Sequence, residues 1–141
     1  SLESLASRTG IVRRLRKAVL EGGETILQEE LGAQLKGVRS RHLRQAITAR
    51  DPLVRRVVRS VAEDTGLGVA AIVSAFGPEY VVMGGGVIEA LHGTMLPIIR
   101  KTVETHVLPG TLDGVQIVTS ALGDDGGISG AAVLARDGVA K

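Results

Sequence analysis

The chain has 141 residues, a length that suits one domain. Hydrophobic residues make up 44% of it, but aromatic side chains are limited to Phe76 and Tyr80, so the core has to be aliphatic. The scarcity of aromatics argues against a nucleic-acid module that stacks bases on rings. With no cysteine, the chain has neither disulfides nor thiolate metal ligands.

No apolar stretch approaches the roughly 20 residues of a membrane span, and the first residues lack the layout of a secretory signal. We therefore expect a cytoplasmic protein without membrane partners. The first residue is Ser1 rather than Met, which suggests a truncated or processed chain.

Charge is distributed unevenly, although the net charge is only +2. Residues 1–60 hold 13 basic and 6 acidic side chains, a net +7, whereas residues 61–141 hold 4 and 9, a net −5. Such asymmetry is compatible with an anionic partner, including nucleic acid bound by the arginine-rich helices at 11–20 and 52–63. The simpler interpretation, which we favour, is that exposed helical faces carry the arginines.

Helical spacing of apolar residues predicts four helices in the first part of the chain. The first covers residues 4–20. A short second helix follows through residues 26–35, and a third begins at Ser40 as its N-cap. The fourth starts at Asp51-Pro52, which combines an N-cap with a first-turn proline.

Residues 67–76 are apolar on nearly every side, which predicts a further, buried helix. Gly66 and Gly68 allow a kink or a close approach near its start. The pair Gly77-Pro78 ends it.

The later part of the chain changes to short strands. The apolar runs 80–83 and 115–118 are typical of buried parallel strands. Each is followed by a glycine-rich turn and a helix. This strand–helix–strand–helix order is that of an α/β domain.

The helix after the first strand covers residues 87–107, and Gly93 and Pro97 are expected to perturb or split it. The second strand leads into a turn at 123–127 and then a helix of small residues at 128–136.

The first candidate binding segment is V-V-M-G-G-G-V-I-E at residues 81–89. Gly84, Gly85 and Gly86 let a ligand approach bare backbone, and the following helix offers free N–H groups to anionic atoms. A dinucleotide fingerprint is excluded because Glu89 stands where its third glycine belongs. On the residues alone, three glycines after a strand more often form a simple tight turn than a binding segment.

Acidic residues give weaker candidates. Asp124 and Asp125 could be metal ligands or acid–base groups, but aspartates just before a helix more simply cap it. Glu3 is a lone carboxylate at a helix start, where it complements the dipole. The histidines lack metal-site spacing, and we expect no metal and no catalytic residue in this chain.

Three segments, in the same order and separation, resemble the ROK family of sugar kinases and repressors. Residues 80–90, Y-V-V-M-G-G-G-V-I-E-A, resemble the family's strand–GGG–helix segment. Residues 119–132, T-S-A-L-G-D-D-G-G-I-S-G-A-A, resemble its closing segment A-x-L-G-x-x-A-G-x-x-G-A-A. Residues 2–11, L-E-S-L-A-S-R-T-G-I, resemble the stretch after its zinc motif C-x-C-G-x-x-G-C-x-E.

The resemblance implies an α/β fold: a helix-rich fragment of the C-terminal domain of a hexokinase/actin-like (ribonuclease H-like) fold, with a small parallel sheet. It implies one domain over residues 1–141. Residues 1–65 would form a helical region, and residues 66–141 the strand–Gly turn–helix region on the nucleotide side.

The resemblance also implies roles for individual residues. Gly84, Gly85 and Gly86 match the glycines that line the nucleotide. Glu3 matches a glutamate that accepts hydrogen bonds from hexose hydroxyls. Ser1 stands where the last zinc-ligating cysteine would be, which leaves zinc in the parent open.

By resemblance, the parent is a glucokinase-like kinase that transfers a phosphoryl group from ATP to a hexose with Mg²⁺. The family's D-x-G-x-T phosphate loop and its catalytic aspartate do not occur in this chain. We therefore expect the chain alone to be inactive and to bind neither cofactor, and to associate with the missing N-terminal half and with copies of itself. The alternative is the sugar-sensing and dimerisation portion of a ROK repressor, with nucleic acid as partner only in that case.

Overall fold

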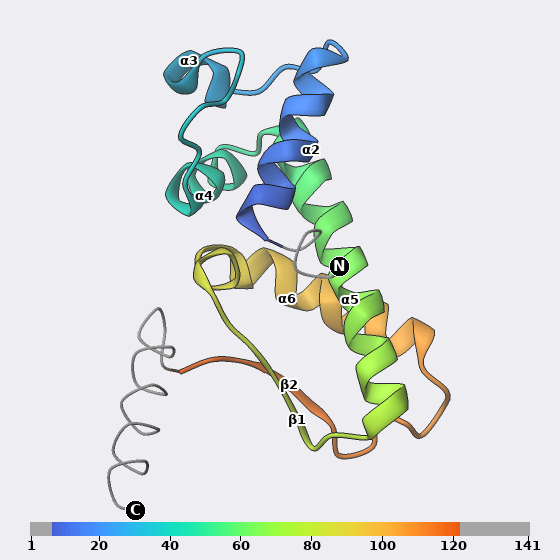
Figure 1. Cartoon of the computed structure of the whole chain (residues 1–141). Coiled ribbons are helices and arrows are strands. Elements are labelled where there is room, and N and C mark those ends of the chain that lie inside the picture. The colour runs from blue at the N-terminus through green and yellow to red at the C-terminus, as the bar shows by residue number, and fades with distance from the viewer. Residues whose placement is uncertain (1–6, 122–141) are drawn as a thin grey trace, which may run out of the picture.

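The computed structural model describes residues 7–121 (Figure 1). The elements in chain order are α2 (Arg8–Leu20), α3 (Leu27–Leu31), α4 (Ser40–Thr48), α5 (Pro52–Phe76), β1 (Tyr80–Met83), α6 (Gly86–His106) and β2 (Gln116–Thr119). Helices α2, α3 and α4 surround the first half of α5 at one end of the molecule. The second half of α5 lies with α6 and the two strands at the other end.

The start of α5 is held by one buried carboxylate. Asp51 is 2% exposed, and its Oδ1 accepts a hydrogen bond of 2.8 Å from the N–H of Val54, as predicted for an N-cap. Its Oδ2 accepts bonds from the Thr25 hydroxyl at 2.7 Å and the Ile26 N–H at 2.8 Å. Asp51 therefore also ties the start of α5 to the segment that leads into α3.

Helix α5 is continuous through the two glycines expected to begin a separate helix, so the prediction of two helices is wrong. The reason is packing against α6. A Cβ atom added at Gly66 would lie 2.6 Å from the Cβ of Thr102 and 3.1 Å from the carbonyl oxygen of Ile99. Gly66 thus permits a close crossing of α5 and α6, and the burial gained there outweighs the roughly 1 kcal/mol by which glycine disfavours a helix.

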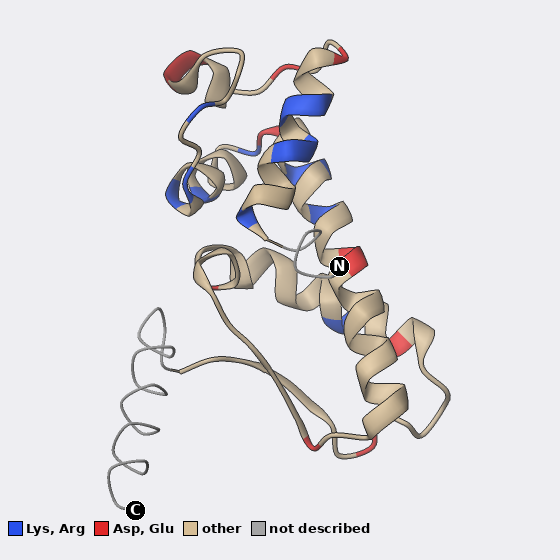
Figure 2. Cartoon of the chain, viewed as in Figure 1, with Lys and Arg blue, Asp and Glu red and all other residues tan. Residues whose placement is uncertain are grey.

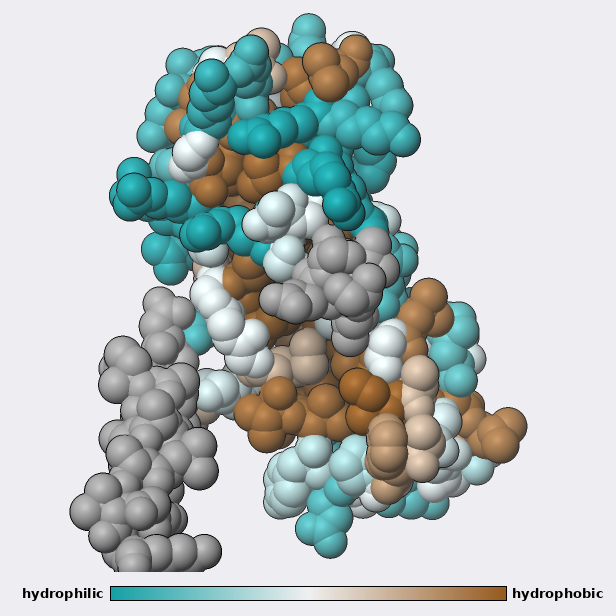
Figure 3. All heavy atoms as spheres, in the orientation of Figure 1, coloured by the Kyte–Doolittle hydropathy of each residue, from teal (hydrophilic) through white to brown (hydrophobic). Residues whose placement is uncertain are grey.

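One face of the last part of α5 is exposed, contrary to the expectation of burial on nearly every side. Leu67, Ile72 and Phe76 are 45%, 41% and 80% exposed, while Val69 and Val73 on the opposite face are buried. Figure 3 shows hydrophobic residues on the surface at this end of the molecule. The apolar composition of this segment therefore includes an uncovered face as well as core.

The α3 region is shorter than predicted, because Gly32 takes a positive φ of 68°, a backbone conformation that favours glycine, and ends the helix. The chain then turns so that Leu35, at φ 47°, buries its side chain completely. Arg16 of α2 stabilises this turn by donating to the carbonyl oxygens of Gln34 at 2.8 Å and Leu35 at 3.2 Å.

The N-cap of helix α4 lies one residue earlier than predicted. Arg39, not Ser40, is the N-cap residue. Its N–H donates to Nδ1 of the buried His42 at 3.0 Å, so a side chain from within the first turn supplies the capping bond.

The two strands form the predicted parallel pair, with Val81 opposite Ile117 and Val82 opposite Val118. The second strand is displaced by one residue from its predicted range. The expectation that both strands are buried is wrong: among their residues only Ile117 is buried in the core, and Val82 is 61% exposed on the other face. The guanidinium of Arg100 on α6 donates two bonds, at 3.2 and 2.6 Å, to the Ile117 carbonyl oxygen and fixes β2 to that helix.

Helix α6 passes through Gly93 and Pro97 as one element, so the expected split does not occur. Pro97 lacks the N–H that would bond to the Gly93 carbonyl. Met95, Ile99 and Val103, on either side of it, are fully buried, and this packing stabilises the helix across the missing bond. Within residues 7–121 no helix has the length and apolarity needed to cross a bilayer.

We predict that Asp51→Ala lowers the free energy of unfolding by about 3 kcal/mol, because it removes an N-cap and leaves buried donors unpaired. Urea denaturation measures the change. Asp113→Ala, at an exposed position, is the control and should change stability by less than about 0.5 kcal/mol. Equal effects of the two substitutions would contradict the role given to Asp51.

Two glycine substitutions should act in opposite directions. Gly66→Ala should destabilise the fold by about 2 kcal/mol, because its Cβ meets Thr102. Gly93→Ala places a Cβ in open space within a helix and should stabilise by about 0.5–1 kcal/mol. Thermal denaturation of both variants checks the pair, and a stabilising Gly66→Ala would show that the helices can separate there.

Candidate functional site

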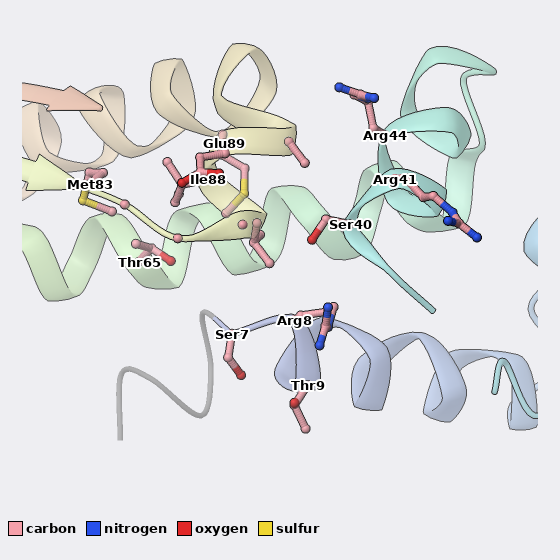
Figure 4. A pocket seen from close by; sticks show the side chains of 16 residues that line it. Ser7, Arg8, Thr9, Ser40, Arg41, Arg44, Thr65, Met83, Ile88 and Glu89 are labelled. Atoms are coloured by element: carbon pink, nitrogen blue, oxygen red, sulfur yellow. The ribbon is translucent and has the colours of Figure 1, made fainter. Parts of the chain in front are cut away.

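A cleft in the described part of the chain lies where β1 turns into α6. It has a volume of about 910 Å³. Its walls are the glycine turn with the first turn of α6, the start of α2, and the start of α4 (Figure 4). Thr65, buried in α5, lines it as well. The lining residues are Ser7, Arg8, Thr9, Ser40, Arg41, Arg44, Thr65, Met83, Gly84, Gly85, Gly86, Val87, Ile88, Glu89, Ala90 and Met95.

The glycine turn presents bare backbone to this cleft. Gly85 is the N-cap of α6, at φ 94°, a conformation that favours glycine. A Cβ at Gly85 would meet nothing within 4 Å, and one at Gly84 would only touch Ser120 at 3.5 Å. No side chain of the described chain therefore plugs the bend, which leaves its backbone open to a ligand.

Three helices begin at the cleft. In α2 the N-cap Ser7 accepts a bond from the Gly10 N–H at 3.2 Å, and in α6 the Glu89 N–H donates to the Gly85 carbonyl at 3.0 Å. The N–H groups before these bonds have no carbonyl partner inside their helices. Together with the start of α4, these ends place three positive dipole ends around one space, which favours an anionic ligand.

Arginine side chains add to this positive charge. Arg8, Arg41 and Arg44 line the cleft, and Glu89 is the acidic residue among its described lining. The side chain of Arg41 turns towards its own helix, where its Nε lies 3.1 Å from Nε2 of His42, while Arg44 extends over the gap between α4 and α6 (Figure 4). Figure 2 shows that Lys and Arg gather on α2, α4 and the first half of α5.

The structure describes some of the site residues that were predicted from the sequence and not others. Gly84, Gly85 and Gly86 do lie together in the cleft. Glu3, Asp124 and Asp125 lie outside the described residues. In the described part of the chain, no three His, Asp or Glu side chains are grouped as metal ligands.

Sequence reasoning missed the other walls. Nothing in the sequence indicated that residues 7–9 and 40–44 face the glycine turn, because the segments are far apart along the chain. Of the two helix starts that form these walls, the sequence indicated only the one near Ser40, because the first helix was predicted to begin at residue 4 and not after Ser7.

Comparison with known proteins identifies relatives of the whole chain. A model described as the ROK family matches residues 1–138. The "Glucokinase" of Halalkalibacterium halodurans is 34% identical over 136 residues, which cover 96% of this chain and 40% of that protein. The crystal structure of a ROK family glucokinase from Streptomyces griseus, in complex with glucose and AMPPNP, is 29% identical with a TM-score of 0.78 and covers 96% of this chain and 44% of its own.

A regulator has the same fold. The crystal structure of a ROK family transcriptional regulator, a homologue of the E. coli MLC protein, has a TM-score of 0.70 at 22% identity and covers 84% of this chain and 28% of its own. The present chain thus spans about two fifths of the length of the curated relatives it matches.

Proposed function

The chain belongs to the ROK family, and from that premise we propose that it is the nucleotide-side portion of a glucokinase-like sugar kinase that transfers a phosphoryl group from ATP to a hexose. Its helices and small parallel sheet have the hexokinase/actin-like fold. We place the protein in the cytoplasm. The division into a helical part, residues 1–65, and a nucleotide-side part, residues 66–141, belongs to the same proposal.

The observation that carries the proposal is the bare glycine turn facing a positively charged cleft. Gly84, Gly85 and Gly86 offer backbone without side chains on one wall. Helix starts and arginines on the other walls supply positive charge. A nucleoside triphosphate combines a flat, weakly polar end with a polyanionic end, and such a cleft suits both.

We assign the adenosine end to the glycine turn and the hexose to Glu3, which would accept hydrogen bonds from sugar hydroxyls. ATP fits the described residues in this way. Mg²⁺ does not, because residues 7–121 contain no grouped set of acidic or histidine ligands, and we assign its ligands to the rest of the parent. The base for the attacking hydroxyl is assigned there too, so the chain alone would be inactive.

A repressor parent is the second candidate, and the ROK regulator with the same fold favours it. We prefer the kinase because relatives at 34% and 29% identity are named glucokinases, whereas the regulator is 22% identical. Upstream sequence discriminates the two: a phosphate loop indicates the kinase, and a helix-turn-helix indicates the repressor and a nucleic-acid partner. For either parent we propose association with copies of itself.

We predict that the isolated chain gives no hexokinase turnover above background, whereas the intact parent phosphorylates glucose with ATP. A coupled assay for ADP measures both. Turnover by the isolated chain would contradict the assignment of the base to the rest of the protein. An intact parent that transfers no phosphoryl group to any hexose would contradict the kinase proposal itself.

Two variants of the parent should separate the two substrates. Gly84 does not have a positive φ, so the variant Gly84→Ala should fold normally. Its added methyl group should hinder the approach of the nucleotide to the backbone of the turn and raise the KM for ATP about tenfold. Glu3→Gln should raise the KM for sugar far more than that for ATP. Steady-state kinetics with each substrate varied checks this, and an unchanged sugar KM and kcat in Glu3→Gln would remove Glu3 from the site.

A further inference from the structure

Arg8 differs from its neighbours on α2 in what its guanidinium does. Arg14 donates to the Ser60 hydroxyl at 2.9 Å and pairs with Asp64, both on α5. Arg16 donates to backbone carbonyl groups after α3. Arg8 is exposed and makes no hydrogen bond or ion pair with any residue in the range 7–121. Within the described residues its charge is therefore not used to stabilise the fold, whereas those of Arg14 and Arg16 are.

The position of Arg8 places that charge at the cleft. It is the first residue of α2 and lines the cleft beside Ser7 and Thr9 (Figure 4). The Ser7 hydroxyl accepts the Gly10 N–H, so the N–H groups of Arg8 and Thr9 stay without a partner inside the helix. The opposite wall is the start of α6. An anion at the α2 wall would meet the N-terminus of α2 and one guanidinium group.

The direction of the bound nucleotide follows from the proposed function, on which this inference rests. The adenosine end is assigned to the glycine turn and the hexose to Glu3. Glu3 precedes Arg8 by five residues, so the sugar site lies within about 17 Å of it along the chain. The phosphoryl group that is transferred lies between nucleotide and sugar. That group is therefore on the α2 side of the cleft.

We propose that Arg8 binds the γ-phosphoryl group of the nucleotide and stabilises it during transfer. In this step the hexose oxygen forms a bond to the γ-phosphorus while the bond to the β–γ bridging oxygen breaks and leaves its electron pair on ADP. The hydroxyl proton passes to the base of the parent, and Arg8 remains protonated throughout. Its planar donors match the equatorial phosphoryl oxygens, on which negative charge is spread.

Arg44 provides a matched control. It is also an exposed arginine that lines the same cleft. It lies on α4, far along the chain from Glu3, to which the hexose is assigned. An effect of general positive charge would appear in both arginines, whereas phosphoryl contact should be specific to Arg8.

The test uses the intact parent with Arg8→Ala, Arg8→Lys and Arg44→Ala. Arg8→Ala should lower kcat at least tenfold and reduce the preference for ATP over ADP in equilibrium binding about tenfold, while ADP affinity changes less than threefold. Arg8→Lys should recover part of the loss, because it keeps the charge but not the planar donors. Arg44→Ala should weaken the binding of ATP and of ADP alike, because Arg44 adds to the general positive charge of the cleft, and the preference for ATP over ADP should therefore change less than threefold.

Unchanged melting temperatures are expected for all three variants, because the two side chains are exposed. If the parent is an active kinase and Arg8→Ala keeps its kcat and ATP preference within twofold, the inference is overturned and the proposed function stands. Equal losses in Arg8→Ala and Arg44→Ala also overturn it, in favour of general charge. If the parent transfers no phosphoryl group from ATP to a hexose, the proposed function and this inference both fail.

Discussion

The close crossing of α5 and α6 at Gly66 is the constraint on which the rest of the structure depends. The absence of a side chain there lets Thr102 approach, and this sets the position of α6 and of the glycine turn at its start. The first half of α5 holds α2 through the Arg14–Asp64 pair. One helix therefore positions both the bare turn and the start of α2. Thr65, next to Gly66, lines the cleft between them.

The electrostatic character of the cleft comes from where the helices begin. Each helix start carries roughly half a positive charge, an effect that falls off within one turn. Placing three of them around one space concentrates this effect without burying an ion pair. The arginines of α2 divide by function: Arg14 and Arg16 are used in packing contacts, and Arg8 is left at the cleft. Anion binding thus requires little rearrangement of the described residues.

The features predicted correctly from sequence depend on local physics. Asp51 before Pro52 is an N-cap because of its own side chain, and the run 80–83 is a strand because of its length and its bounding residues. The errors arise where distant contacts decide. The continuity of α5 through Gly66 depends on Thr102, 36 residues later. The exposure of Phe76 depends on which surfaces are present to cover it. The cleft includes features of both kinds. Its glycine wall could be predicted from the local sequence, whereas the walls from α2 and α4 depend on contacts between distant segments.

The composition of the cleft also explains why positioning, rather than proton transfer, is assigned to this chain. Its described lining offers backbone N–H groups, hydroxyls and guanidinium groups, which bind anions and accept no proton at neutral pH. The acidic member, Glu89, stands in the first turn of α6, where its charge complements the helix dipole. A transfer reaction further needs an acceptor hydroxyl held in line with the phosphorus and a base beside it. The acceptor hydroxyl and the base belong to the sugar site, so in the proposed function they lie on the side of the cleft where α2 begins. There Arg8 would contact the phosphoryl group that is transferred.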